Sequence, residues 1–312
     1  MNVLHKTKRP PEAETVQEVE RLSRRSRRVH DFIHSLFFSG PSFLGMLIFF
    51  IIPFGVVVYY SFISGALDHS FAGLKNYISV IQNGAFKIAV KNTAVFSALS
   101  VPLAVILALA LALMLEARIP FKSQFRTFFL SPMMVPIASI ILVWQVLFHD
   151  NGVVNEVLKA FGQDKIYWFS SNASLLVIVI LFLWKNLGYN MILFMAALNN
   201  VPKAMLEAAE VEGASEWTQF VHIKLRYLSP TILFVTILSI INSFKVFREI
   251  YLLTGNYPYD SLYMLQHFMN NVFRQLDYQK LSAAAVLLAI VIVILIAILF
   301  AVENFFGKDV EG

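Results

Sequence analysis

The sequence predicts an all-α integral membrane protein with six transmembrane helices. Of its 312 residues, 58% are apolar and only 14% are charged, whereas about a quarter of the residues in an average soluble domain are charged. Six stretches are apolar over the roughly 20 residues that a helix needs to cross the hydrocarbon core of a bilayer. Because no water is available there, each span must satisfy its own backbone hydrogen bonds, as a helix does. Together these observations exclude a soluble domain.

The six predicted spans are Leu36–Phe62, Lys91–Leu115, Thr127–Phe148, Ser174–Leu198, Pro230–Leu253 and Ser282–Phe305. The second is the clearest, because Val101–Leu115 contains no charge and Pro102 is its one helix breaker. The third contains Pro132 and Pro136, which we expect to kink it beside a cavity. The fifth is the least apolar, since three charged residues lie in its second half.

Lysine and arginine are concentrated in alternate connections, which sets the predicted orientation. They cluster in the N-terminal tail and after the second and fourth spans, at Lys6, Lys8, Arg9, Arg21, Arg24, Arg25, Arg27, Arg28, Arg118, Lys122, Arg126, Lys203, Lys224 and Arg226. Both termini are therefore predicted in the cytoplasm. The expected parts are a basic tail (1–35), a first helix with an external loop (36–87), a core (88–305) and a short C-terminus (306–312). We expect the tail to touch anionic lipid and not nucleic acid.

The connection between the fourth and fifth spans, Asn199–Ser229, contains two predicted short helices. Pro202 suits the start of a helix that runs to Glu212, and Gly213 can stop it in a left-handed conformation. Residues 215–221 form the second helix. The first helix carries several acidic side chains, which anionic lipid would repel, so the segment suits a protein partner better than a membrane surface.

This connection contains Glu207-Ala208-Ala209, then Gly213, Phe220, Ile223, Leu225 and Pro230. That pattern resembles the EAA loop of binding-protein-dependent ABC transporter permeases. In that family the loop forms a coupling helix, which docks in a groove of a separate ATP-hydrolysing subunit. The resemblance implies that the ATPase contact is made by Glu207, Ala208, Ala209, Glu210, Gly213 and Phe220. Arg226 replaces a proline that is usual in the family, for which we expect altered local geometry and not a loss of coupling.

Further segments are similar to carbohydrate-type permeases, and to the maltose-F-like half in particular. They are Phe71-Ala72-Gly73-Leu74-Lys75-Asn76-Tyr77, Phe86, Asn92-Thr93, Phe125-Arg126-Thr127, Trp144…Phe148…Gly152…Asn155, Trp184, Gly188 and Leu252-Leu253-Thr254-Gly255-Asn256-Tyr257-Pro258. Asn256 and Tyr257 replace two glycines of the family pattern. The resemblance implies the type I importer permease fold in a bacterial or archaeal cytoplasmic membrane. It also implies three kinds of protein partner: a second permease subunit that completes a heterodimer, two ATPase subunits that bind ATP and Mg²⁺, and an extracytoplasmic solute-binding protein.

Polar residues within the spans are the candidates for a substrate path. In carbohydrate permeases the middles of spans three, four and five line the sugar path, which here points to Met133, Lys185, Tyr189, Asn190, Asn242, Ser243, Lys245 and Phe247. Lys185 lies near the middle of its span, where a lysine costs about 2.5–3.5 kcal/mol. It either faces the cavity or pairs with an acid such as Glu249. We also expect Lys245 and Glu249 to share a helical face and neutralise each other.

The sequence offers little for catalysis. It contains no cysteine, no Walker lysine motif and no recognisable nucleophile–base spacing, so we expect a transport subunit that binds no cofactor itself. The histidines lack metal-ligand spacing, and His149 and His267 are expected to face solvent.

Three functions remain open. The first is a sugar or oligosaccharide importer, the second an ABC importer for another solute such as a polyamine, and the third a channel or secondary transporter. The third would predict acidic relays and internal repeats, which the sequence lacks. Spans three and four contain no Asp or Glu, so one acid, Glu249, faces three bases. Unless a partner subunit supplies acids, this surplus of positive charge points to an acidic substrate, such as a uronic-acid oligosaccharide contacted by Lys185, although a neutral oligosaccharide is the main expectation.

Overall fold

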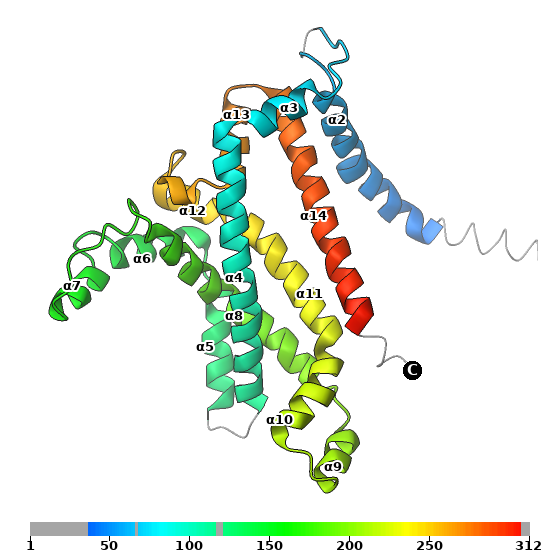
Figure 1. Cartoon of the computed structure of the whole chain (residues 1–312), viewed down its shortest axis with the longest axis vertical. Helices are drawn as coiled ribbons and strands as arrows, with labels where there is room; N and C mark the ends of the chain where they lie inside the picture. The colour runs from blue at the N-terminus through cyan, green and yellow to red at the C-terminus, as the bar shows by residue number, and fades with distance from the viewer. Residues whose placement is uncertain (1–36, 66–67, 117–120, 307–312) are drawn as a thin grey trace, which may run out of the picture. The chain divides into compact units, whose positions relative to one another are not determined.

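The computed structural model describes residues 37–65, 68–116 and 121–306 (Figure 1). The chain divides into two compact units, Met1–Tyr59 and Tyr60–Gly312. Within the described residues the regular structure is helical, and the one strand-like pairing is an isolated antiparallel bridge between Ile63 and Phe71. The predicted all-α class is confirmed.

The first unit is described from residue 37 and consists of helix. A π-helical turn, η1 (Leu47–Ile51), leads into α2 (Ile52–Ser61), which ends in the second unit. None of the side chains at positions 37–59 is buried. A helix that is apolar on every side and unburied suits a lipid environment.

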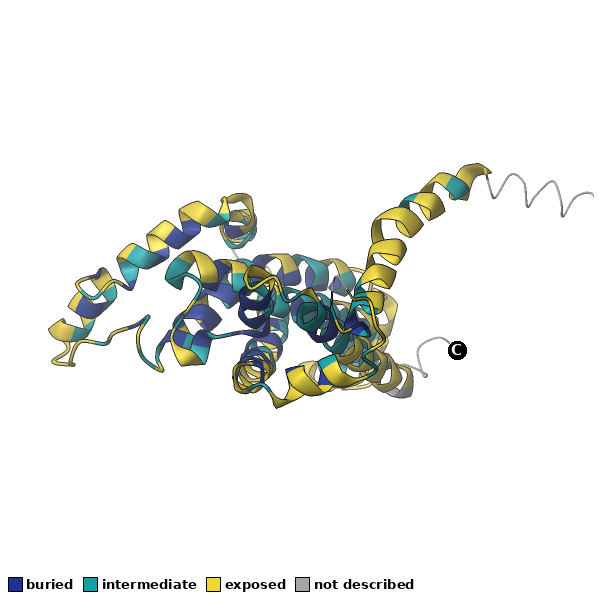
Figure 2. Ribbon diagram, turned by 90° about the horizontal axis from the view of Figure 1, so that it is seen from above, coloured by how far each residue is buried: buried dark blue, intermediate teal, exposed yellow. Residues whose placement is uncertain are grey.

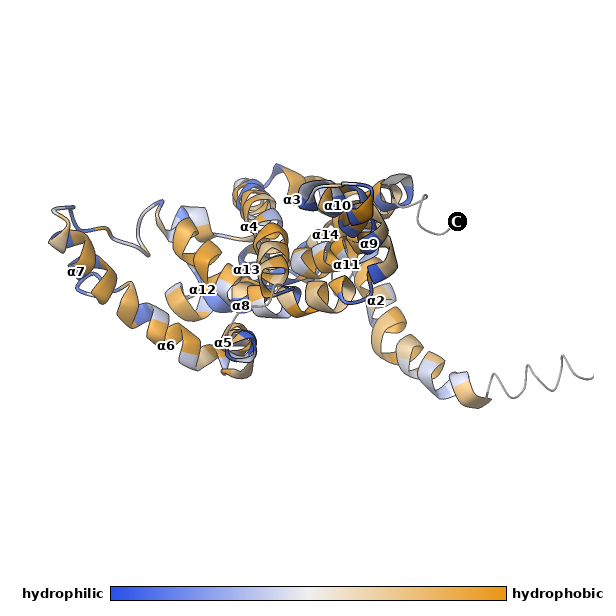
Figure 3. Cartoon of the chain, turned by 90° about the horizontal axis from the view of Figure 1, so that it is seen from below, coloured by the Kyte–Doolittle hydropathy of each residue, from blue (hydrophilic) through white to orange (hydrophobic). Residues whose placement is uncertain are grey.

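The second unit contains the remaining helices in a simple order. They are α3 (Lys75–Gln82), α4 (Gly84–Glu116), α5 (Lys122–Met134), α6 (Ile137–Leu147), α7 (Val153–Ala160), α8 (Ser174–Leu198), α9 (Lys203–Val211), α10 (Glu216–Gln219), η2 (Phe220–Lys224), α11 (Leu225–Phe244), α12 (Phe247–Thr254), η3 (Asp260–Leu262), α13 (Leu265–Arg274) and α14 (Tyr278–Phe306). Figure 3 shows apolar residues along all the long helices.

Five helical segments in the described residues are long and apolar enough to cross a membrane. They are Phe37–Ser61, Gly84–Glu116, Ser174–Leu198, Glu216–Thr254 and Tyr278–Asn304. A sixth span results if α5 and α6 count as one broken span. This agrees with the six spans predicted from the sequence.

The third span differs from the prediction, because it is broken and not merely kinked. α5 and α6 meet at an angle of 101°. Val135, which precedes Pro136, has an extended backbone with ψ of 131°, since the proline ring disfavours the helical conformation in the residue before it. Pro132 lies inside α5 without ending it.

The fifth span also contains a break. Here four backbone hydrogen bonds join residues three apart and not four apart. The donors are the N–H groups of Lys245, Val246, Arg248 and Glu249, and each donates to the carbonyl of the residue three positions before it. Such bonds tighten the turn relative to an α-helix. The fifth span is therefore not a regular helix between Lys245 and Glu249, the two residues predicted to share one of its faces.

The core of the second unit is built around α8, which packs against α4, α5 and α11. Figure 2 shows the buried residues gathered in its centre. Small residues of α4, Ala108 and Ala112, allow close contact with Met191 and Phe194 of α8. Gly188 is required on the α5 side, because a Cβ there would lie 1.9 Å from the carbonyl oxygen of Phe129.

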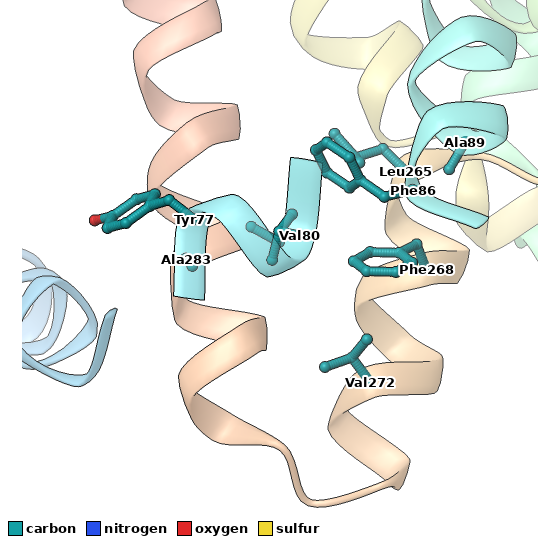
Figure 4. Close-up of a cluster of buried hydrophobic side chains, with 9 residues drawn as sticks. Tyr77, Val80, Phe86, Ala89, Leu265, Phe268, Val272 and Ala283 are labelled. Atoms are coloured by element: carbon teal, nitrogen blue, oxygen red, sulfur yellow. The ribbon is translucent and has the colours of Figure 1, made fainter. Parts of the chain in front are cut away.

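A second cluster joins α3, α4, α13 and α14. Figure 4 shows Val80 of α3 pointing between Ala283 of α14 and Phe268 of α13. Two residues before it connect α3 to the end of α2: Asn76 donates to the carbonyls of Ser61 and Ile63, and the Tyr77 hydroxyl lies 2.6 Å from that of Ser61. The segment that resembles carbohydrate permeases here thus has a structural role.

Candidate functional site

The membrane part of the second unit contains a cavity of about 420 Å³. It lies where the breaks in the third and fifth spans approach α8, and its walls come from α5, α6, α8, α11 and α12. Its lining combines apolar side chains with seven polar ones, Lys185, Asn186, Tyr189, Asn242, Lys245, Arg248 and Glu249. Both helix breaks therefore serve to open a polar space among the spans.

The depth of the cavity follows from its position on α8. Lys185 is the twelfth of the 25 residues of this helix, which is about 37 Å long at 1.5 Å per residue. The cavity therefore lies near the middle of the span, where a charged group must be paired or hydrated.

Lys185 is paired: its Nζ donates to Oε1 of Glu249. The lysine side chain is 38% exposed and the glutamate 7%. The second carboxylate oxygen, Oε2, has no partner within the described residues. The predicted Lys245–Glu249 pair is wrong, because the tightened turn at residues 245–246 removes the helical i,i+4 geometry on which that prediction rests.

Lys245 and Arg248 are both exposed, and within the described part of the chain neither has a carboxylate partner. Beside them, the Asn242 side chain donates to Oδ1 of Asn186 at 3.0 Å. The ring of Tyr189 is also partly exposed to the cavity. The wall thus offers cationic groups, amides and an aromatic face together.

Five of the eight predicted path residues line this cavity: Met133, Lys185, Tyr189, Asn242 and Lys245. Whether they contact a substrate stays a prediction. The structure adds Asn186 and Arg248, which the sequence reasoning did not assign to the path. Asn186 is three residues from Tyr189 on the same helix, so an argument from helical faces could have selected it.

The other three predicted path residues do not line the cavity. Asn190 is buried and donates to the Ser239 hydroxyl at 3.0 Å, which joins α8 to α11. The Ser243 hydroxyl lies 2.8 Å from that of Ser97 in α4. Phe247 packs edge-on against the ring of His267, with centroids 4.6 Å apart.

His267 does not face solvent as predicted: it is fully buried in α13. Its Nδ1 accepts from the backbone N–H of Met264 at 3.2 Å, while Nε2 has no partner within the described residues. Burial lowers the pKa of His267 to about 4, because charge is disfavoured away from water. His149 is exposed, as expected.

A second candidate site is the segment 199–229, which lies at one end of the helices of the second unit (Figure 1). α9 has no buried residue. Gly213 has φ of +81°, and the N–H of Ala214 donates back to Ala209 at 2.9 Å. The predicted left-handed stop is therefore present.

The predicted coupling residues are displayed on this segment. Glu207, Ala208, Glu210 and Gly213 are exposed, and Ala209 and Phe220 are partly exposed. Apolar side chains beside them are also open to solvent: Val211 is 89% exposed and Trp217 71%. Exposed large apolar groups beside acidic ones are typical of a surface that binds another protein.

The second predicted helix of this segment is not separate. Ser215 caps α10 by accepting from the N–H of Thr218 at 3.2 Å, and the chain then continues as helix through η2 into α11. Arg226 lies in the first turn of α11 without interrupting it. Lys224 forms an ion pair with Glu116 at the end of α4, at 2.9 Å, which connects the segment to that span.

The chain is similar in sequence to known membrane transport proteins. Residues 100–312 match the family model described as "Binding-protein-dependent transport system inner membrane component". The arabinooligosaccharides transport system permease protein AraP of Halalkalibacterium halodurans is 32% identical over 184 residues, 58% of each chain. AraP of Bacillus subtilis is 28% identical over 85% of this chain and 86% of that one. The lactose transport system permease protein LacF of Rhizobium radiobacter is 28% identical over 91% and 96%.

A solved structure is similar over most of the chain. It is that of a bacterial ABC transporter involved in the import of the acidic polysaccharide alginate, and one of its chains aligns with a TM-score of 0.76. The alignment covers 89% of this chain and 98% of that one at 21% sequence identity. At this identity the likeness shows a shared fold.

Proposed function

Because the chain belongs to the family of binding-protein-dependent transport system inner membrane components, we propose that it is the membrane subunit through which an ATP-driven importer moves an oligosaccharide. The observation that carries this proposal is the polar cavity at mid-depth of α8. Its volume of about 420 Å³ falls in the usual range of small-molecule sites, about 300–1,000 Å³.

The chemistry of the cavity wall suits a sugar. The amides of Asn186 and Asn242 can donate to and accept from hydroxyl groups, and the exposed Tyr189 ring offers an apolar face to a pyranose. The relatives named for arabinooligosaccharides and lactose support the same substrate class. A polyamine suits it poorly, because three cationic side chains line the cavity and would repel a polycation.

The coupling residues Glu207, Ala208, Ala209, Glu210, Gly213 and Phe220 form the proposed contact with an ATPase subunit. Support comes from their exposure and from α9, which has no buried residue. ATP and Mg²⁺ would bind to two such subunits. A second permease subunit would complete the cavity in a heterodimer, and a solute-binding protein would deliver the sugar from outside.

The proposed orientation in the cytoplasmic membrane has both termini inside. It rests on the basic residues of the N-terminal tail and of the segment that contains α9. Reporter fusions after Asn76, Gly162 and Asn271 should report an external location, and fusions after Lys122 and Ala214 a cytoplasmic one. A cytoplasmic reporter at Gly162 would overturn the pairing of the third and fourth spans.

The test of the substrate class is uptake by the complete transporter in lipid vesicles. We expect ATP-dependent entry of labelled oligosaccharides of two to six units when the loaded binding protein is present. Uptake of spermidine is measured in a parallel experiment. Entry of spermidine without entry of any sugar would contradict the proposal and leave the alternative of a non-sugar importer.

A further inference from the structure

We infer that Lys245 and Arg248 form a subsite for a negatively charged group of the substrate, the carboxylate of a uronic-acid unit. The inference rests on the proposed function, since it takes the cavity as the sugar path. It assigns the two residues a role in selecting the charge of the sugar, which membership of the family does not specify.

The cavity lining has more positive than negative side chains. Three cations and one anion line it: Lys185, Lys245, Arg248 and Glu249. Glu249 is committed to Lys185 through Oε1. Within the described residues neither Lys245 nor Arg248 forms an ion pair. The described part of this chain therefore leaves two positive charges without a counter-charge at one wall of the cavity.

These charges lie near the middle of the spans. Glu249 contacts Lys185 at the middle of α8, and Lys245 and Arg248 lie within one turn of Glu249 across the break in the fifth span. Cations at this depth are costly unless water or an anion meets them. Both side chains are exposed and line the cavity, so an anion entering it can meet them directly.

The side chains of Lys245 and Arg248 suit a carboxylate. A guanidinium binds a carboxylate through two parallel hydrogen bonds, and an ammonium adds a compact point charge. Asn242 and Tyr189 line the same cavity and can receive the hydroxyls and the ring of the same sugar unit. Because Lys185 is paired with Glu249, we assign the anion to Lys245 and Arg248 and not to Lys185, the contact predicted from the sequence.

The test offers a mixed pool to vesicles that contain the complete transporter. The pool combines acidic oligosaccharides from pectin and alginate with neutral ones from arabinan and starch, and mass spectrometry identifies what enters. We expect acidic species to enter in preference. Lys245→Gln and Arg248→Gln should each raise the apparent KM for these species by about tenfold to a hundredfold, the loss of one charge-assisted hydrogen bond.

Three matched variants control this result. Lys159→Gln removes an exposed lysine from α7, away from the cavity, and should transport like the wild type. Lys245→Arg and Arg248→Lys keep the charge and should retain most acidic uptake, which separates lost recognition from failed assembly. Entry of neutral species alone would overturn the inference and leave the proposed function standing. Entry of no sugar at all would contradict the proposed function itself.

Discussion

At the scale of single residues, the ion pair between Lys185 and Glu249 determines how the cavity is charged. The sequence predicts that a lysine in the middle of a span needs a counter-charge, and Glu249 was among the candidates. Which base would take the acid could not be predicted, because the answer depends on the turn at residues 245–246. That turn follows directly after Ser243, whose hydroxyl lies 2.8 Å from that of Ser97 in another helix, and no local sequence signal marks it.

This pairing makes a prediction about stability. Lys185→Met should lower the stability of the protein by about 2 kcal/mol, because it leaves the buried Glu249 carboxylate without its cation. This is less than the roughly 3–5 kcal/mol seen for fully buried pairs, since Lys185 is partly exposed. Adding Glu249→Gln should restore part of the loss. Thermal unfolding in detergent measures both, and equal midpoints for the single variant and the wild type would contradict the pairing.

The buried His267 predicts a dependence on pH. Its folded pKa of about 4 lies below the ordinary 6.5, so the unfolded chain binds an additional proton between these values. Stability should therefore fall as the pH falls from 6.5 to 4, by an amount on the order of 3 kcal/mol, and show no contribution from this group above 6.5. In His267→Gln this part of the acid sensitivity should disappear. Parallel pH profiles for the variant and the wild type would show that the group is not buried.

At the scale of helices, the points where a helix breaks or ends shape both candidate sites. Pro136 was visible in the sequence, but a proline predicts a kink or a break equally, and the 101° angle depends on how α6 packs. Gly213 is different. Its left-handed stop was predictable from local propensity, because glycine follows a run of strong helix formers and the end of α9 is exposed, so tertiary contacts do not override the local preference.

Gly213 therefore offers a test of coupling with a matched control. Gly213→Val should disfavour the left-handed turn by about 1–2 kcal/mol, which lowers the population of the docking geometry by about 5–30-fold. Stimulation of ATP hydrolysis by the loaded binding protein should fall accordingly, with normal membrane insertion. Gly162 has φ of +73° and equally open space around it, so Gly162→Val applies the same strain elsewhere. Equal coupling in both variants would argue against docking through α9.

At the scale of the whole molecule, the sequence predicts the fold class and the number of spans because both follow from a solvent requirement that acts on every residue. It also predicts the segment 199–229 as a protein contact, because its acidic face is local. The cavity could be predicted only in part. Asn190 and Ser243 are polar residues in the middle of spans, as Asn242 is, but they are buried between helices and do not line the cavity. Distinguishing the two cases requires the helix rotations, which a single sequence does not contain.

The central claim is that the chain moves a sugar inward with energy from ATP. The most direct measurement uses vesicles with the complete transporter, ATP inside, and loaded binding protein with a labelled oligosaccharide outside. We predict accumulation against the sugar gradient with ATP, none with a non-hydrolysable analogue, and no effect of proton or sodium ionophores. Accumulation that persists without ATP hydrolysis, or that the ionophores abolish, would contradict the claim and indicate a channel or a secondary transporter.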